Sequence, residues 1–297
     1  MIVCGKNVAV SGRFIRIARL DADGYQFLDQ PESFLEGLRT SRSRFDLFTF
    51  MQKLSESTPN FSYPMEWDNL AALPLTTYDR WWNEQLRFKA RNKARQAAKK
   101  GVSFRIVPFG DELVRGIWEI YNECPVRQGR PFTHFGKDLA TVHKEEATYL
   151  ESSVFIGAFF EGKMIGFVKL LWDETQTQAG LMNIVSMIKH RDKAPTNALI
   201  AEAVRVCAGR GTSYLVYSNF AYGKKPSDSV AEFKASNGFQ RFELPRYYVP
   251  LTPLGARAYR VGLHRKWVDR FPQPVVRKVR QLRNARYNRK MQSHVEA

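Results

Sequence analysis

The chain has 297 residues, of which 44% are hydrophobic and 13% aromatic. A sizeable core is therefore available, in one large domain or two small ones, and global disorder is excluded. Its three cysteines, Cys4, Cys124 and Cys207, lie far apart in sequence, which argues against a disulfide framework and against a structural zinc site. We therefore expect no metal. We also expect a cytoplasmic location, because no secretory signal is visible and the most apolar window, 155–172, is broken by charged residues and glycine.

The net charge of +17 belongs to two segments. Residues 86–100 contain seven Lys or Arg and no acid, and residues 255–297 contain twelve against two acids. The rest of the chain is balanced. Localised charge of one sign suggests an anionic partner, here a tRNA or an anionic membrane surface at which the protein would lie peripherally. The alternative for either segment is a solvated basic face without a partner.

The first third of the chain predicts strands and helices in alternation, separated by a polar, proline-containing loop before residue 70. In chain order the predicted elements are a strand over 7–20, a helix over 31–40, a strand over 45–54, a short strand over 70–75 and a long basic helix over 78–101. Thr76 or Thr77 can cap that long helix, and Gly101 closes it.

The remainder predicts a second series of elements that ends in a basic, helical tail from residue 252. The turn Glu161-Gly162-Lys163 is a hairpin signal between two of its strands. In chain order the elements are a strand over 102–109, a helix over 111–124, a loop over 125–138, a short helix to about 149, strands over 153–160, 163–172 and 178–188, a helix over 196–209, a strand over 213–219, a helix over 227–236 and a strand over 239–250.

The order from 102 to 250 resembles that of the GNAT acyltransferases. Residues 155–172 are similar to the central hairpin of these enzymes, 191–217 to their loop, helix and following strand, and 233–251 to their closing FKxxxGF element. The resemblance implies a GNAT fold, an α/β architecture of the α+β type with a mixed central sheet flanked by helices.

The basic stretch 87–102 further resembles the Arg/Lys helix that precedes the second acyltransferase domain in FemAB-like proteins. These proteins transfer amino acids from tRNA to cell-wall peptides and pair two GNAT-like halves. The resemblance divides the chain into a partial N-terminal α/β lobe (1–77), a basic helix (78–101), an acyltransferase domain (102–251) and a basic helical tail (252–297). The first lobe is too short for a complete GNAT copy, and we interpret it as a truncated one.

In GNAT enzymes the pyrophosphate of acyl-CoA sits on backbone N–H groups at the start of the helix that 196–209 matches, where the helix dipole favours an anion. The positions implied for this donor site are Arg191, Lys193, Ala194, Thr196 and Asn197. None is glycine, which would let the backbone approach closely. Thr196 or Asn197 can instead cap the helix, so a self-capped structural turn is the alternative.

The loop after the next strand, 218–225, flanks the gap where the acyl group lies in GNAT enzymes. Asn219 or Tyr222 would hydrogen-bond the thioester or the departing cofactor, and Lys224 would meet phosphates. The alternative is a glycine-containing loop with solvated lysines.

Hydrogen-bonding side chains gather in the aromatic loop 125–138. Arg127, Gln128 and Arg130 are candidates to bind the acceptor substrate, because Arg forks recognise carboxylates. His134 is a candidate general base near neutral pH, with a structural histidine as the alternative.

Two further pairs are candidates in the outer strands. Glu66 and Asp68 face one side if their segment is extended, where they would bind a substrate amine or act as a base, with pairing to the basic helix as the alternative. Tyr247 and Tyr248 point to opposite faces of the last strand, so at most one, taken as Tyr248, reaches the site.

The resemblance implies an N-acyltransferase with acyl-CoA as co-substrate or with an aminoacyl-tRNA donor. A base takes the proton of the acceptor amine, the amine attacks the carbonyl, and backbone N–H groups near 183–188 polarise that carbonyl. The alternative function is a non-catalytic module of the same fold that binds RNA or an anionic membrane through its basic segments.

Overall fold

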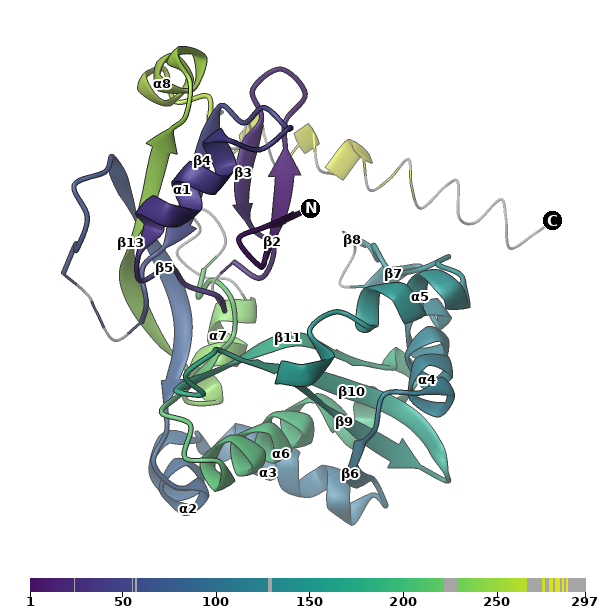
Figure 1. The fold of residues 1–297 in the computed structure, drawn as a ribbon. Helices are drawn as coiled ribbons and strands as arrows, with labels where there is room; N and C mark the ends of the chain where they lie inside the picture. Colours follow the sequence, from purple (N-terminus) through teal and green to yellow (C-terminus); the bar gives the residue numbers. More distant parts are fainter. Residues whose placement is uncertain are drawn as a thin grey trace.

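The computed structural model of the chain describes residues 1–297 except 24, 55, 57, 128–129, 222–228, 266–273, 276–277, 280, 284, 286 and 288–297. Within the described part, eleven strands form one mixed sheet with helices on both faces, as the sequence predicts (Figure 1). The sheet order is β1-β2-β3-β4-β13-β5-β12-β11-β10-β9-β6, and β7 pairs with β8 separately. The predicted tail helix, 274–290, falls partly outside the described residues, and those of its residues that are described are helical.

The strands are β1 (Ile2–Val3), β2 (Lys6–Ser11), β3 (Ile17–Leu20), β4 (Leu47–Met51), β5 (Met65–Pro74), β6 (Ser103–Val107), β7 (Val126–Arg127), β8 (Arg130–Pro131), β9 (Ser153–Phe160), β10 (Lys163–Trp172), β11 (Gln178–Ser186), β12 (Tyr214–Val216) and β13 (Gln240–Pro250). The helices are α1 (Pro31–Arg39), α2 (Tyr78–Arg80), the π-helical turn η1 (Trp81–Gln85), α3 (Phe88–Lys99), α4 (Asp111–Asn122), α5 (Leu139–Glu146), the 3₁₀ turns η2 (Leu150–Ser152) and η3 (Ile188–Lys193), α6 (Pro195–Gly209), α7 (Ser229–Ser236) and α8 (Pro253–Arg260). Among the described residues, no helix is both long and apolar enough to cross a bilayer.

The half of the sheet formed by β6 and β9 to β12 is covered on both faces (Figure 1). On one face α4 packs over β10, with the Tyr121 and Phe167 rings 5.9 Å apart between centroids. On the other face α6 packs so closely that a Cβ on Gly166 would meet Leu199 at 3.2 Å. Helix α3 packs against α6. Two-sided burial explains why β10 is apolar along nearly its whole length.

The N-terminal lobe is completed by the last strand of the chain. Strand β13 pairs antiparallel with β5 over Gln240–Tyr247 and with β4 over Arg246–Pro250. Its Tyr247 is buried in an aromatic cluster with Phe34, Phe48 and Phe50, under α1. Strand β5 in turn pairs with β12, so it joins the lobe to the half of the sheet formed by β6 and β9 to β12.

Three predicted elements differ from the observed ones. The strand predicted over 7–20 is a hairpin of two antiparallel strands, β2 and β3, with a turn over 12–16. The long helix predicted over 78–101 is broken, because buried Leu86 is extended and the Arg87 N–H donates to the Ser236 carbonyl at 3.0 Å, outside the helix. Strand β5 begins at Met65 and not at residue 70, because its pairing with β13 extends to Tyr247 opposite Met65. Glu66 and Asp68 therefore lie on a strand.

A buried polar network ties α4 and α5 to the sheet. The Lys169 ammonium on β10 is fully buried and donates to the carbonyls of Glu146 and Thr148, at 2.8 and 2.7 Å. The buried Glu146 carboxylate accepts from the Tyr121 hydroxyl at 2.9 Å and from the Asn183 amide on β11 at 3.0 Å. Burial raises the pKa of Glu146 and lowers that of Lys169. The network thus satisfies carbonyls that the end of α5 leaves without helical partners.

Replacing Lys169 with Met should lower the free energy of unfolding by about 3–5 kcal/mol, because it strands a buried carboxylate and two buried carbonyls while keeping the apolar stem. Lys163→Met, at the exposed start of the same strand, is the matched control and should change stability by no more than about 0.5 kcal/mol. Urea denaturation of both variants measures the difference, and equal stabilities would contradict the network's role.

Candidate functional site

The sheet opens where β11 and β12 part. The pairing joins only Gln178–Gly180 of β11 to Tyr214–Val216 of β12, although β11 continues to Ser186. A register shift against β10 also leaves a bulge at Met182, between the pairs of Leu181 and Asn183. Beyond Gly180, β12 therefore no longer occupies the backbone groups of β11 on this side. This segment overlaps residues 183–188, for which the GNAT resemblance implies carbonyl polarisation.

Buried Lys234 holds the chain that leaves β12. Its ammonium donates to the carbonyls of Tyr217 and Asn219, both at 2.6 Å, and lies 4.4 Å from the centroid of the Tyr217 ring. Lys234 itself comes from α7 and is fully buried. It belongs to the closing FKxxxGF element, whose Lys therefore satisfies backbone carbonyls in this chain.

A charge cluster lies across β5, β13 and the segment after β12. The Arg246 guanidinium donates to Asp68 at 2.7 Å and to Asp23 at 2.8 Å. Asp68 also accepts from the Asn219 amide at 2.9 Å. Burial alone would lower the pKa of Arg246, but the two carboxylates outweigh it and raise that pKa. The second oxygen of Asp23, Oδ1, is buried and has no hydrogen-bond partner in the described part of the chain.

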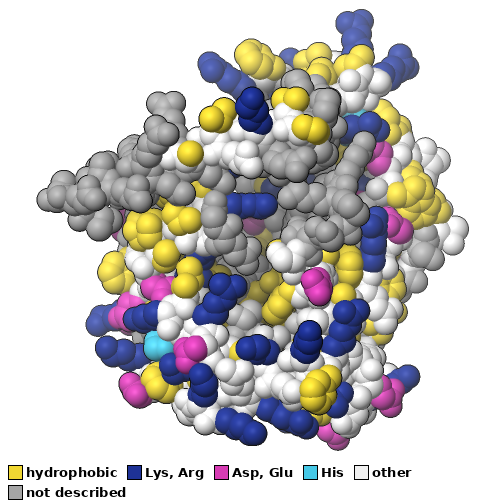
Figure 2. Space-filling view, turned by 180° about the vertical axis from the view of Figure 1, so that it is seen from behind, with side chains coloured by type: hydrophobic (Ala, Val, Ile, Leu, Met, Phe, Trp, Pro, Cys, Tyr) yellow, Lys and Arg dark blue, Asp and Glu magenta, His cyan; other side chains and the backbone are white. Residues whose placement is uncertain are grey.

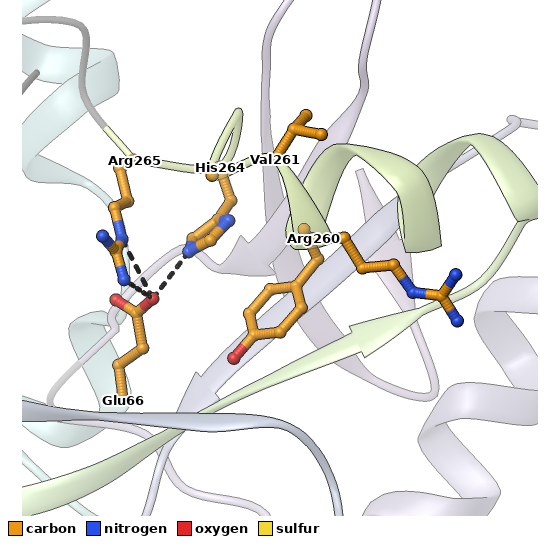
Figure 3. A pocket seen from close by; sticks show the side chains of 7 residues that line it. Glu66, Arg260, Val261, His264 and Arg265 are labelled. Atoms are coloured by element: carbon orange, nitrogen blue, oxygen red, sulfur yellow. Dashed lines mark hydrogen bonds and ion pairs between the residues drawn. The ribbon is translucent and has the colours of Figure 1, made fainter.

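Beside this cluster, a cavity of about 420 Å³ lies between β5 and the end of α8. Glu66 Oε1 accepts from Arg265 Nη2 and contacts His264 Nε2, both at 2.9 Å (Figure 3). Figure 3 shows both side chains pointing at Glu66, whereas Arg260 and Val261 turn away from it. Burial by itself would raise the pKa of Glu66, but the bonds from His264 and Arg265 hold it below its ordinary value.

Tyr248 lies on the same face of the outer strands. Its ring contacts Tyr259 and His264, with centroids 5.5 and 4.6 Å away. Burial raises its pKa to about 12, so the hydroxyl stays protonated near neutral pH and can donate but not act as a base. Tyr247, one residue earlier, points into the core and donates to Gln52 at 2.6 Å. The expected opposition of the two tyrosines is confirmed.

The predicted donor loop runs along helix α3. Ala194 is left-handed and starts α6 without a side-chain cap, with Pro195 at the first helical position. Thr196 contacts the Ser186 hydroxyl at 2.7 Å and Asn197 donates to Asn237 at 3.4 Å. The self-capped turn is therefore wrong, because both side chains capable of capping bind elsewhere.

The lysine of this loop, Lys193, has partners. Lys193 lies 4.4 Å from the Phe160 ring centroid and pairs with Asp192 at 3.5 Å, and Arg191 precedes it in η3. Asp192 is in turn bound by Lys100, at the end of α3, at 2.9 Å. The loop and the basic helix thus form one surface.

The loop over 125–138 meets the end of β11. Arg127 donates to the Ser186 carbonyl at 2.7 Å, so Arg127 and Thr196 both hold this residue. The half-buried His134 ring stacks on Tyr121, with centroids 4.3 Å apart. Burial, aided by Lys137, lowers the pKa of His134, so its ring is neutral near pH 7. Arg130 is exposed on β8.

The structure therefore brings Glu66 and Tyr248 together through His264, and Asp68 together with Asn219 from the segment after β12. It also joins Arg127 to the start of α6 at Ser186. The remaining predicted residues, Gln128, Tyr222 and Lys224, lie outside the described residues. The alternative pairing of Glu66 and Asp68 with the basic helix is wrong, because their partners are Arg265 and Arg246. In the part that the structure describes, no three His, Cys, Asp or Glu side chains are grouped to hold a metal.

Sequence reasoning missed Asp23, Arg246, His264 and the buried lysines. Arg246 could have been found, because it stands two residues before Tyr248 and so shares its face of β13. Asp23 carried no signal, since it reaches Arg246 from a position 223 residues away.

The Glu66 pairing should give the protein an acid-sensitive share of its stability. Because the folded pKa lies below the unfolded value, the contribution is present above the ordinary carboxyl pKa of about 4.3 and is lost as pH falls through the folded pKa. Glu66→Gln should therefore be less stable than the wild type at about pH 7, with a difference that shrinks toward about pH 3. Glu36→Gln is the control, because it removes an exposed ion pair with Arg39 on α1 and should change stability little at either pH. A pH-independent difference for Glu66→Gln would contradict this assignment.

No family model and no curated protein matches this sequence. Among solved structures, the chain is similar to L-PGS from Bacillus licheniformis, with a TM-score of 0.54 and 11% identity over 86% of this chain and 84% of that one. It is similar to FemX, with a TM-score of 0.52 and 11% identity over 79% and 71%. It is also similar to a C-terminal domain (DUF2156) assigned to a lysylphosphatidylglycerol synthetase from Agrobacterium fabrum, with a TM-score of 0.52 and 14% identity over 85% and 82%. The predicted GNAT-type fold with FemAB-like features is confirmed, and at these identities the likeness concerns the fold.

Proposed function

We propose that this protein is an N-acyltransferase that transfers an aminoacyl group from aminoacyl-tRNA to an amine acceptor. The observation that carries the proposal is the continuity of the α6 N-terminus with the exposed basic face of α3. Gln96 donates to the Asp192 carbonyl at 2.6 Å and Lys100 pairs with its carboxylate, so the uncapped helix start lies beside that face.

The extent of this basic surface favours a polyanionic donor. The exposed cations of α3 and its ends are Arg87, Lys89, Lys93, Arg95, Lys99 and Lys100. Figure 2 shows many Lys and Arg side chains over its lower half, where Figure 1 places α2, α3 and α6. A CoA pyrophosphate needs only the helix start and one or two cations, whereas a tRNA backbone presents phosphates along a longer track.

The acceptor would bind through carboxylates of the outer strands. Asp23 Oδ1 is buried without a partner in the described part, and Glu66, which lies opposite Arg246 in the β5–β13 pairing, lines the cavity. An ammonium or amine group is a donor of the kind that Asp23 Oδ1 lacks. His134 remains the proposed base, and the opened edge of β11 is the proposed place for the carbonyl.

An acyl-CoA donor is the second candidate, because the α6 N-terminus is where GNAT enzymes hold the CoA pyrophosphate. Incubating the protein with an amine panel and either aminoacyl-tRNA or acetyl-CoA, each labelled in the acyl group, separates the two. Labelled product should form from aminoacyl-tRNA and not from acetyl-CoA. Product from acetyl-CoA alone would exclude the tRNA donor, and tRNA binding without product from either donor would favour the non-catalytic alternative.

The basic surface also predicts a salt-dependent affinity. Lys93→Gln with Lys99→Gln should weaken tRNA binding at low salt and make the plot of log K against log salt shallower by about one to two units, because each lost phosphate contact removes just under one. Lys144→Gln with Lys163→Gln removes the same charge from exposed positions on α5 and β10 and should leave the slope unchanged. Equal slopes for the two double variants would place the tRNA elsewhere.

A further inference from the structure

One end of the N-terminal lobe is built around a single buried carboxylate. Asp46 accepts from the Arg16 N–H at 3.0 Å and from the Thr252 hydroxyl at 2.8 Å, so it joins the β2–β3 turn to the start of α8. Helix α8 packs so closely that a Cβ on Gly255 would lie 1.7 Å from the Asp46 carbonyl oxygen. The β2–β3 turn and α8 therefore form one fixed surface at this end.

Large apolar side chains project from this surface into solvent. Phe14, at the tip of the β2–β3 turn, is 87% exposed, and Val261, just after α8, is 68% exposed. Leu254 in α8 and Leu263 just after it are also exposed. Isolated exposed apolar residues are ordinary, but four at one end of a lobe indicate a surface that a partner covers.

The same end is strongly cationic. Its exposed arginines are Arg13, Arg42, Arg44, Arg257, Arg260 and Arg265. The acidic groups Asp46 and Glu66 are each bound by one of these arginines. Figure 2 shows hydrophobic and Lys or Arg side chains together along its upper edge, where Figure 1 places α8 and the β2–β3 turn.

We propose that this end of the molecule, with Phe14 and α8 at its centre, is a docking surface for an anionic lipid bilayer. Projecting apolar side chains among arginines match the boundary between acyl chains and anionic head groups. A second copy of the chain would bring the same positive charge and repel it. A nucleic acid would satisfy the arginines but would leave the aliphatic side chains in water.

The placement gives the docked protein a defined orientation. Arg260, Val261 and Arg265 belong both to this surface and to the lining of the Glu66 cavity, so the cavity opens beside the bilayer. The basic face of α3 belongs to the other half of the molecule and stays available to a donor. Under the proposed function, the acceptor would reach the cavity from the membrane side. Docking itself does not depend on that function.

Sedimentation of the full chain with vesicles tests the docking. The protein should bind vesicles of phosphatidylglycerol and phosphatidylcholine in equal parts and not phosphatidylcholine alone. Phe14→Ser should weaken that binding at least tenfold, whereas Phe88→Ser, which removes an equally large ring of 72% exposure from α3, should not. Equal effects of the two substitutions, no effect of either, or binding to phosphatidylcholine alone would overturn the proposal.

A direct measurement of insertion covers the case in which another part of the chain also binds lipid. The fluorescence of the added tryptophan is obtained by subtracting the wild-type spectrum from that of the variant. Brominated lipids should quench this difference signal for Phe14→Trp and should not quench it for Phe88→Trp. Absence of quenching at position 14 would overturn the proposal. It would also be overturned if RNA released the wild type from vesicles but did not release Phe14→Ser, because residue 14 would then contact the RNA. Transfer to a soluble amine, measured without lipid, reports separately on the proposed function.

Discussion

The pairing of β13 between β4 and β5 is the constraint on which the rest of the structure depends. As an interior strand, β13 has hydrogen-bond partners along both edges, and its alternating side chains serve two environments. Tyr247 completes the aromatic core of the lobe, whereas Arg246 and Tyr248 face the candidate acceptor site. One strand therefore fixes both the stability of the N-terminal lobe and the geometry of the charge cluster.

Buried lysines hold the irregular backbone on both sides of the opened strands. Lys169 binds the carbonyls at the end of α5, and Lys234 binds those of the segment after β12. Each ammonium offers three donors, so one side chain satisfies several carbonyls that no helix or ladder reaches. The segments around the gap are thus held in place without regular secondary structure, as a site with fixed backbone groups requires.

Much of the fold followed from local pattern. The hairpin over 161–163, the apolar β10 and the helix after Pro195 have strong short-range signals, and the order of elements from 102 to 250 carried the resemblance that the structure confirms. The partners of β13 could not be predicted, because alternation states which face a residue takes and not which strand lies beside it. The same limit explains the site. Glu66 and Asp68 were found from residue type, but Asp23 meets Arg246 only through pairing between distant parts of the chain.

The position of β13 also sets the order in which the chain can fold. Phe50 and Gln52 both contact Tyr247, whose hydroxyl donates to Gln52 from 195 residues further along the chain. Neither contact can form before Tyr247 has been made. Until residues 240–250 have been synthesised, the facing edges of β4 and β5 lack their strand and the core of the first lobe is incomplete. Such non-local closure slows folding and leaves strand edges open to wrong partners in the meantime. The lobe that is made first is therefore finished last, and a nascent chain would need protection from aggregation over most of its synthesis.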